Sequence, residues 1–197
     1  MIRSMVRSTI NNEQWYKSML AGNVITGDYE LIQTQILTGT QAEIVFSNLG
    51  NFSTTYKHLQ LRFSGRANGS YTETALRSRF NADAGNNYVK HFLLGDGSTV
   101  SSALFEGTSS SNALTGLVSG SLATTNSFFA GYVDLLDFAS TTKNKTTRAL
   151  SGGTGGANRI DLHSGLWMNT NAVTSWTLLV ASGSFIAGSR FSLYGIR

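Results

Sequence analysis

The chain of 197 residues contains no cysteine and no proline, and it carries few charges. Without cysteine it cannot form a disulfide framework, a zinc finger, an iron–sulfur site or a cysteine nucleophile. Charged residues make up 13% of the chain, against roughly 25% in an average globular domain. The 15 basic and 11 acidic residues give a net charge of +4, which is too sparse to form a dense basic field.

Long hydrophobic runs are also missing. No stretch approaches the roughly 18 apolar residues of a membrane helix. Arg3 and Arg7 are not followed by the apolar segment of about 7–15 residues that a secretory signal requires. The basic run of Lys143, Lys145 and Arg148 is short and has no base-stacking motif beside it. We therefore expect no membrane partner and no nucleic-acid partner.

The sequence does contain a strong alternation of apolar and polar residues, and 41% of its residues are hydrophobic. In the segment 57–65, Leu59, Leu61 and Phe63 fall on one face and polar side chains on the other. Such alternation is typical of half-buried antiparallel strands. The pattern predicts strands at Tyr29–Leu37, Ala42–Phe46, Lys57–Gly65, Leu76–Phe80, Val89–Leu94, Phe128–Asp137, Arg148–Leu150, Arg159–Trp167, Ala172–Val180 and Phe191–Leu193.

Clusters of Gly, Asn, Asp and Ser separate these segments and supply turns without proline. They lie at Asn48–Asn51, Asn81–Asn87, Gly95–Ser98 and Ser151–Asn158. About eight to eleven short strands at this spacing, with no helical pattern between them, indicate an all-β fold. We expect an antiparallel β-sandwich, of the jelly-roll kind, over residues 28–197.

The first 27 residues depart from this pattern and predict an extended arm that contains a short helix. Asn11 is a candidate N-cap, and Trp15 with Met19 and Tyr16 with Leu20 are i, i+4 pairs. A helix of about ten residues does not persist alone in water, so it needs a docking surface. We expect Trp15, Tyr16, Met19 and Leu20 to anchor the arm on a sister subunit or on another protein. The alternative is an N-terminus that packs on its own sandwich or is swapped between subunits.

The stretch Gly107–Asn126 consists mostly of Ser, Thr, Gly, Ala and Leu. It is compatible with an exposed long loop, with a surface hairpin or with a pair of weak edge strands. Its low charge and small side chains also suit close packing against another protein surface. The sequence leaves these alternatives open.

No motif of the sequence indicates a metal or a cofactor. His58, His91 and His163 are far apart, and no HExxH pattern is present. Asn81–Gly85 resembles the start of a calcium loop, but Phe92 stands at the twelfth position, where a bidentate Glu belongs. We expect a turn there, and no metal site.

The Gly-rich segments Gly95–Gly97 and Gly152–Gly156 lack the endings of phosphate-binding loops, so we expect hairpin turns. Asp134 and Asp137 are the closest pair of carboxylates, but a separation of three residues on a strand places them on opposite faces. There is no G-x-S-x-G nucleophile motif. We therefore expect no catalytic residues and no enzyme.

Trp167 and Trp176 are candidates for a sugar-binding platform. In a β-sandwich, however, tryptophans on strands more often belong to the core. We expect them in the core.

Six segments carry a further signal, and none of them is a catalytic motif. They are residues 18–23 (SMLAGN), 56–62 (YKHLQLR), 80–88 (FNADAGNNY), 94–98 (LGDGS), 163–167 (HSGLW) and 192–197 (SLYGIR). Taken in order over nearly the whole chain, these segments resemble a family of small virion structural proteins from tailed bacteriophages, best represented among phages of aquatic bacteria.

The resemblance implies a non-enzymatic component of the virion, assembled in the host cytoplasm. The favoured role is a capsid decoration (cement) protein that docks on the shell of the major capsid protein through its arm and its sandwich. The alternative is a tail, collar or fibre component that contacts glycans of the host surface. By analogy with decoration proteins of sandwich fold, we expect a homo-oligomer and specifically a trimer.

Overall fold

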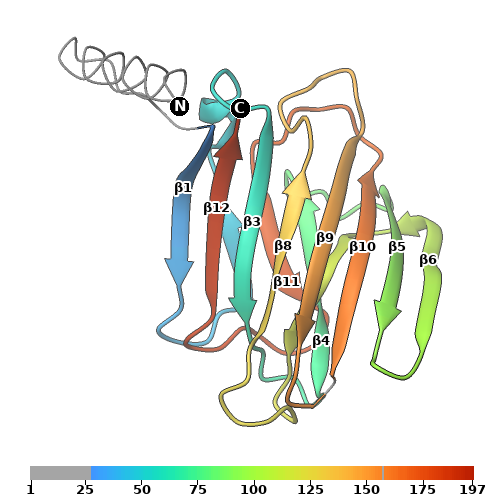
Figure 1. Cartoon of the computed structure of the whole chain (residues 1–197). Coiled ribbons are helices and arrows are strands. Elements are labelled where there is room, and N and C mark those ends of the chain that lie inside the picture. Colours follow the sequence, from blue (N-terminus) through green and yellow to red (C-terminus); the bar gives the residue numbers. More distant parts are fainter. Residues whose placement is uncertain (1–27, 157) are drawn as a thin grey trace, which may run out of the picture.

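Two antiparallel β-sheets form the fold, as the alternating sequence predicts (Figure 1). The structure is a computed structural model that describes residues 28–156 and 158–197, and of residues 104–109 the backbone alone. The strands are β1 (Tyr29–Ile36), β2 (Glu43–Phe46), β3 (His58–Gly65), β4 (Glu73–Phe80), β5 (Tyr88–Gly95), β6 (Val100–Ser110), β7 (Ala113–Ser119), β8 (Phe129–Leu135), β9 (Lys145–Gly153), β10 (Arg159–Trp167), β11 (Trp176–Val180) and β12 (Arg190–Ile196).

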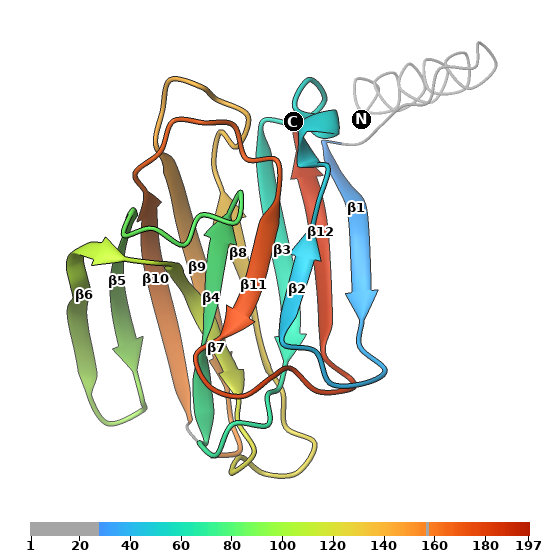
Figure 2. The same ribbon diagram turned by 180° about the vertical axis from the view of Figure 1, so that it is seen from behind.

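The larger sheet has eight strands in the order β1-β12-β3-β8-β9-β10-β5-β6, and the smaller sheet has four in the order β2-β11-β4-β7. The smaller sheet covers one face of the larger sheet, and β5 and β6 extend beyond it (Figures 1 and 2). The opposite face of the larger sheet is left uncovered by the described residues. A 3₁₀ helix, η1 (Leu49–Phe52), leads from β2 toward β3. Among the described residues, no helix has both the length and the apolar character to cross a membrane.

The core lies between the two sheets and follows the predicted alternation. On β3, Leu59, Leu61 and Phe63 point inward and are buried. Trp176 and Leu178 of β11 meet them from the smaller sheet and are fully buried. The predicted all-β sandwich is therefore confirmed.

The stretch Gly107–Asn126 contains the end of β6 and the whole of β7. Each of these strands lies at an edge, β6 in the larger sheet and β7 in the smaller. β7 is buried along most of its length, because the larger sheet covers it. The structure has edge strands at 107–110 and 113–119 and a loop at 120–126. A surface hairpin is not formed, because β6 and β7 belong to different sheets. The small side chains of Ala113–Ser119 pack against this chain's own larger sheet.

The described residues form twelve strands, more than expected, because strands rich in Thr, Ser and Gly show little alternation. β9 runs over Lys145–Gly153, where the sequence predicted only Arg148–Leu150. The prediction of a strand from Ala172 was wrong at its start, because β11 begins at Trp176. The predicted hairpin turns are confirmed: Gly95–Gly97 connects β5 to β6, and the second Gly-rich segment connects β9 to β10.

Candidate functional site

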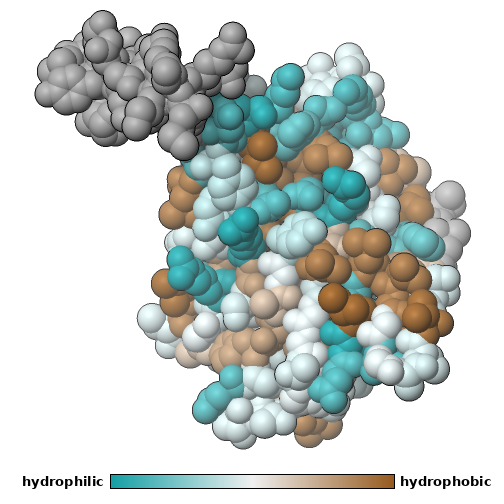
Figure 3. All heavy atoms as spheres, in the orientation of Figure 1, coloured by the Kyte–Doolittle hydropathy of each residue, from teal (hydrophilic) through white to brown (hydrophobic). Residues whose placement is uncertain are grey.

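The uncovered face of the larger sheet, which we call the outer face, is the candidate functional site. Figure 3 shows this face, with hydrophobic side chains gathered over β9, β10 and β5.

Strand β10 exposes apolar side chains and buries polar ones, which is the reverse of the usual burial pattern. Ile160 and Leu162 point outward and are 56% and 50% exposed, while Asp161 and His163 point inward and are buried. Exposed large apolar side chains and buried polar ones are the informative departures from the general pattern of burial.

The outward apolar side chains form one row across four strands. In the register of the sheet, Tyr132 of β8 lies opposite Leu150 of β9, Leu150 opposite Leu162 of β10, and Leu162 opposite Leu93 of β5. We call these four residues the apolar row. Side chains that lie directly opposite on one face are in contact distance, so the row is continuous. On β6, Ser102 lies opposite Leu93, and Val100, at 77% exposed, lies two residues away opposite Gly95.

A cluster of aromatic and polar side chains lies beside the apolar row on β1, β12 and β3. The rings of Tyr29 and Tyr194 stack with centroids 4.7 Å apart. The Arg62 guanidinium lies 5.1 Å and 5.4 Å from these two centroids. Gln60 accepts hydrogen bonds from the Tyr29 hydroxyl at 2.7 Å and from Arg62 Nε at 3.1 Å. It also donates to Asp134 at 2.7 Å.

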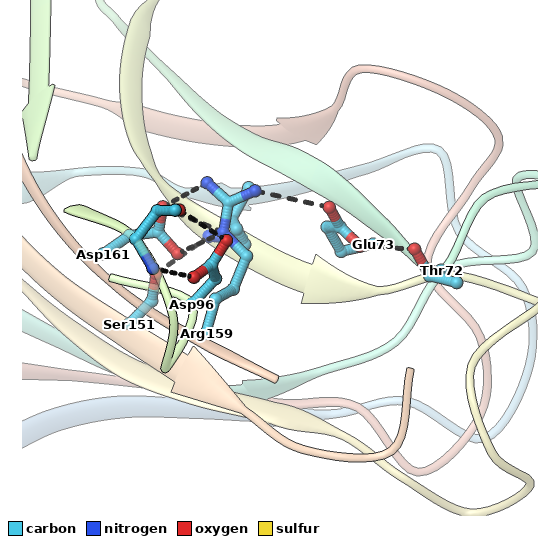
Figure 4. A network of polar contacts seen from close by, with 8 residues as sticks. Thr72, Glu73, Asp96, Ser151, Arg159 and Asp161 are labelled. Atoms are coloured by element: carbon cyan, nitrogen blue, oxygen red, sulfur yellow. Dashed lines mark hydrogen bonds and ion pairs between the residues drawn. The ribbon is translucent and has the colours of Figure 1, made fainter. Parts of the chain in front are cut away.

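The inward side of β10 carries a charged group that joins the two sheets. Arg159 Nε donates to Asp161 Oδ2 at 2.9 Å, and its Nη1 reaches Glu73 Oε1 of β4 at 3.4 Å. Figure 4 shows the guanidinium between the two carboxylates. Burial alone lowers the pKa of Arg159, but the two carboxylates outweigh it and raise the pKa. Arg159 neutralises both Asp161 and Glu73. This arrangement is typical of a structural ion pair between the sheets and not of a catalytic acid–base pair.

The three histidines have different surroundings. His163 is 2% exposed, and neither of its ring nitrogens has a hydrogen-bond partner in the described part of the chain. Burial lowers its pKa to about 4. His91 is exposed on the outer face, and His58 Nδ1 accepts a hydrogen bond from the Asp137 backbone N–H at 3.0 Å. Over residues 28–156 and 158–197, no three metal-binding side chains gather around one point.

The other residues considered from the sequence have structural roles. Asp137 lies in the turn after β8 and accepts a hydrogen bond from Lys143 at 2.7 Å, which is the main reason why its pKa is lowered. Asp134 lies on β8, so the two acids form no pair across a cleft. The basic run is not continuous on the surface, because Lys145 is fully buried and donates to the carbonyl oxygens of Lys143 and Thr170.

Trp167 and Trp176 belong to the core, as expected, with 1% and 0% exposure. Trp167 Nε1 donates to Asp83 and Trp176 Nε1 to Ser78. Asn81–Gly85 forms the expected turn.

The predicted anchor residues, Trp15, Tyr16, Met19 and Leu20, lie outside the described residues. The apolar row was not found from the sequence. The available signal was the order of residues in 159–167, where Ile160, Leu162 and Leu166 alternate with Asp161 and His163. The alternation does not say which set faces the solvent.

No family model and no curated protein matches the chain. Among solved structures, it is similar to the Ruminococcus gnavus IT-sialidase CBM40 bound to alpha2,3 sialyllactose, with 10% identity and a TM-score of 0.34, over 83% of this chain and 91% of that one. A second, NanB plus Optactamide, has 15% identity and a TM-score of 0.35, over 83% of this chain and 26% of that one. Similarities this weak do not indicate a function, and the sandwich fold is established by the strand pairing described above.

Proposed function

We propose that the chain is a non-enzymatic structural component of a tailed-bacteriophage virion, and specifically a capsid decoration protein. In this proposal the outer face docks on the shell of the major capsid protein, and residues 1–27 add a second contact through Trp15, Tyr16, Met19 and Leu20. The observation that carries the proposal is the apolar row. The resemblance of the sequence to virion proteins supplies the partner.

The apolar row gives a physical reason for docking. Leu162, Leu93 and Tyr132 are 50%, 44% and 38% exposed, and removing apolar surface from water stabilises a complex by roughly 25 cal/mol per Å². Their surroundings on the outer face are polar, as in the rim of a protein interface. A second contact through the arm would raise the overall affinity, because the first contact brings the arm close to its own binding surface.

The test is incorporation into particles. Virions that lack the protein are mixed with the purified chain, separated by sedimentation, and analysed for bound protein. Leu162→Asp places a charge in the middle of the apolar row and is expected to reduce incorporation more than tenfold. Val45→Asp is the matched control, because Val45 is an exposed apolar residue on β2 of the smaller sheet, away from the outer face, and this variant should incorporate normally. Equal incorporation of the Leu162 and Val45 variants would contradict docking through the outer face.

The arm is tested in the full chain. Replacing Trp15, Tyr16, Met19 and Leu20 together with Ala should leave a folded protein that no longer incorporates. Unchanged incorporation would refute the arm as an anchor and leave the outer face untouched as a docking surface.

The tail, collar or fibre component remains the alternative, and it differs in copy number. A decoration protein occupies the repeated positions of the capsid lattice, whereas a tail component follows the symmetry of the tail. A cryo-EM map of the particle distinguishes the two stations and also gives the oligomeric state, for which a trimer is proposed.

A further inference from the structure

An open hollow lies on the outer face between β3 and β12, next to the stacked Tyr29 and Tyr194 rings. It has a volume of about 270 Å³ and is lined by Arg62, Phe63, Ser64, Arg190, Ser192 and Tyr194. The hollow is near the lower end of the size range of small-molecule sites, which begins at about 300 Å³. It therefore has room for one small ring.

The register of the two strands arranges the polar lining as a diagonal pattern. Arg62 lies opposite Ser192, and Ser64 lies opposite Arg190. Two guanidinium groups and two hydroxyl groups thus alternate around the hollow, and no carboxylate lines it. Neither arginine has an ion-pair partner in the part of the chain that the structure describes. The lining of the hollow therefore carries two positive charges and no carboxylate, which favours the binding of an anion.

Arg62 is held in place before any ligand arrives. Its Nε donates to Gln60 Oε1 at 3.1 Å, and the same Gln60 is fixed by Tyr29 and by Asp134 at 2.7 Å each. The stacked rings of Tyr29 and Tyr194 lie against its guanidinium. The contact with Gln60 uses Nε of Arg62, and among the described residues no carboxylate forms an ion pair with its guanidinium. A side chain held in this way loses less conformational entropy when it binds.

Ser192 supplies a buried donor. It is 4% exposed, and its Oγ accepts hydrogen bonds from Thr34 Oγ1 at 3.0 Å and from Arg190 Nε at 3.4 Å. A hydroxyl has two acceptor positions and one hydrogen to donate. With both acceptor positions in use, the Ser192 hydrogen is available to a ligand oxygen in the hollow.

We infer that this hollow binds an acidic saccharide, a sugar ring that carries a carboxylate or a sulfate. The anionic group accepts hydrogen bonds from the terminal nitrogens of Arg62 and Arg190 and from Ser192. The ring lies against Tyr194, and Ser64 meets its hydroxyl groups. The hollow is wider than a lone carboxylate requires, which favours a ring over the side chain of an acidic residue. This assignment goes beyond the proposed function. At a capsid station it requires that docking through the apolar row on β8, β9, β10 and β5 leaves the part of the outer face on β3 and β12 accessible.

The test compares two ligands that differ only in the acid. Methyl glucuronide and methyl glucoside are titrated into the full-length protein, and binding is followed by saturation-transfer NMR and calorimetry. We expect the glucuronide to bind at least tenfold more tightly than the glucoside. The 6-sulfate of methyl glucoside is tested in parallel, and it should bind like the glucuronide if the two arginines recognise any compact anion.

Variants locate the site. Arg190→Gln and Ser192→Ala should each weaken glucuronide binding at least fivefold. Arg77→Gln is the matched control, because Arg77 lies on β4 of the smaller sheet and not on the sheet that carries the hollow. This variant should bind like the unmodified chain. Thermal unfolding of each variant shows that the fold is retained.

Three results would overturn the assignment. Equal binding of the glucuronide and the glucoside would show that the anion is not recognised. Unchanged binding in both the Arg190 and the Ser192 variants would place the ligand elsewhere. Displacement of the glucuronide by acetate or by a short acidic peptide at equal concentration would show that the hollow takes a bare carboxylate and not a sugar.

Discussion

The indole Nε1 of Trp167 donates a hydrogen bond of 2.7 Å to Oδ2 of Asp83, which ties β10 to the turn between β4 and β5. Asp83 also accepts from Asn87 Nδ2 at 2.9 Å and from the Gly85 backbone N–H at 2.8 Å. Burial raises the pKa of Asp83, but these three hydrogen bonds outweigh burial and lower it. Asp83, in the segment that resembles the start of a calcium loop, thus fixes the core residue Trp167 and the turn Asn81–Gly85 by hydrogen bonds.

Replacing Asp83 with Ala should lower the free energy of unfolding by about 1–3 kcal/mol, because it leaves the buried indole N–H without an acceptor. Urea denaturation measures the change. Glu43→Ala is the control, because Glu43 is exposed on β2 and its removal should change stability by less than about 0.5 kcal/mol. Equal effects of the two substitutions would show that the Trp167 hydrogen bond contributes nothing.

The sandwich could be predicted from the sequence because several strands separate apolar and polar residues cleanly. Leu59, Leu61 and Phe63 all face the core, as their spacing indicates. For β7 the sequence left a strand and a loop open, because ALTGLVS gives no clean alternation and its burial depends on the larger sheet above it. Local pattern defines a strand only where one face differs from the other.

The outer face could not be predicted, for a different physical reason. The inward position of Asp161 depends on Arg159 and on Glu73, which lies 86 residues before Arg159 in the sequence. Without that long-range contact, the alternation in 159–167 would favour Ile160 and Leu162 inside. The hollow likewise depends on the pairing of β3 with β12, which the sequence alone does not reveal.

Acid should destabilise the protein through His163. Its pKa is about 4 in the folded state against an ordinary value of 6.5, so below pH 6.5 the unfolded chain takes up a proton that the folded chain does not. The free energy of unfolding should therefore fall by up to about 1.4 kcal/mol per pH unit as the pH drops from 6.5 toward 4. Denaturation curves at several pH values in this range measure the slope.

His163→Gln removes the titrating group, so its stability should change less steeply over the same pH range. The slopes of the unmodified chain and of the His163 variant are compared over the same pH values, so that their difference gives the contribution of His163. If the His163 variant keeps the full slope, other groups cause the acid sensitivity.

The charged group between the sheets should respond unequally to substitution of its members. Arg159→Met leaves Asp161 fully buried without its cation and should cost about 3–5 kcal/mol. Glu73→Gln should cost no more than about 1 kcal/mol, because the ion pair of Glu73 with Arg159 is partly exposed. The double variant Arg159→Met, Asp161→Leu should recover most of the loss, since an apolar pair replaces a buried ion pair at little cost. Thermal and urea unfolding of the three variants test this order, and a double variant as unstable as Arg159→Met would contradict it.

Gly195 lies under the ring of Tyr56, and a Cβ at this position would overlap the ring. Tyr56 is 8% exposed, and its hydroxyl donates to Glu30 on β1. Gly195→Ala should therefore push the ring outward and lower the free energy of unfolding by about 1–3 kcal/mol. Gly39→Ala, where a Cβ meets nothing within 4 Å, serves as the control and should leave the free energy of unfolding unchanged.

In a Tyr56→Ala background the overlap is gone, so adding Gly195→Ala should lower the free energy of unfolding by almost nothing further. A full, additive loss in the double variant would show that Gly195 is required for a reason other than the tyrosine ring.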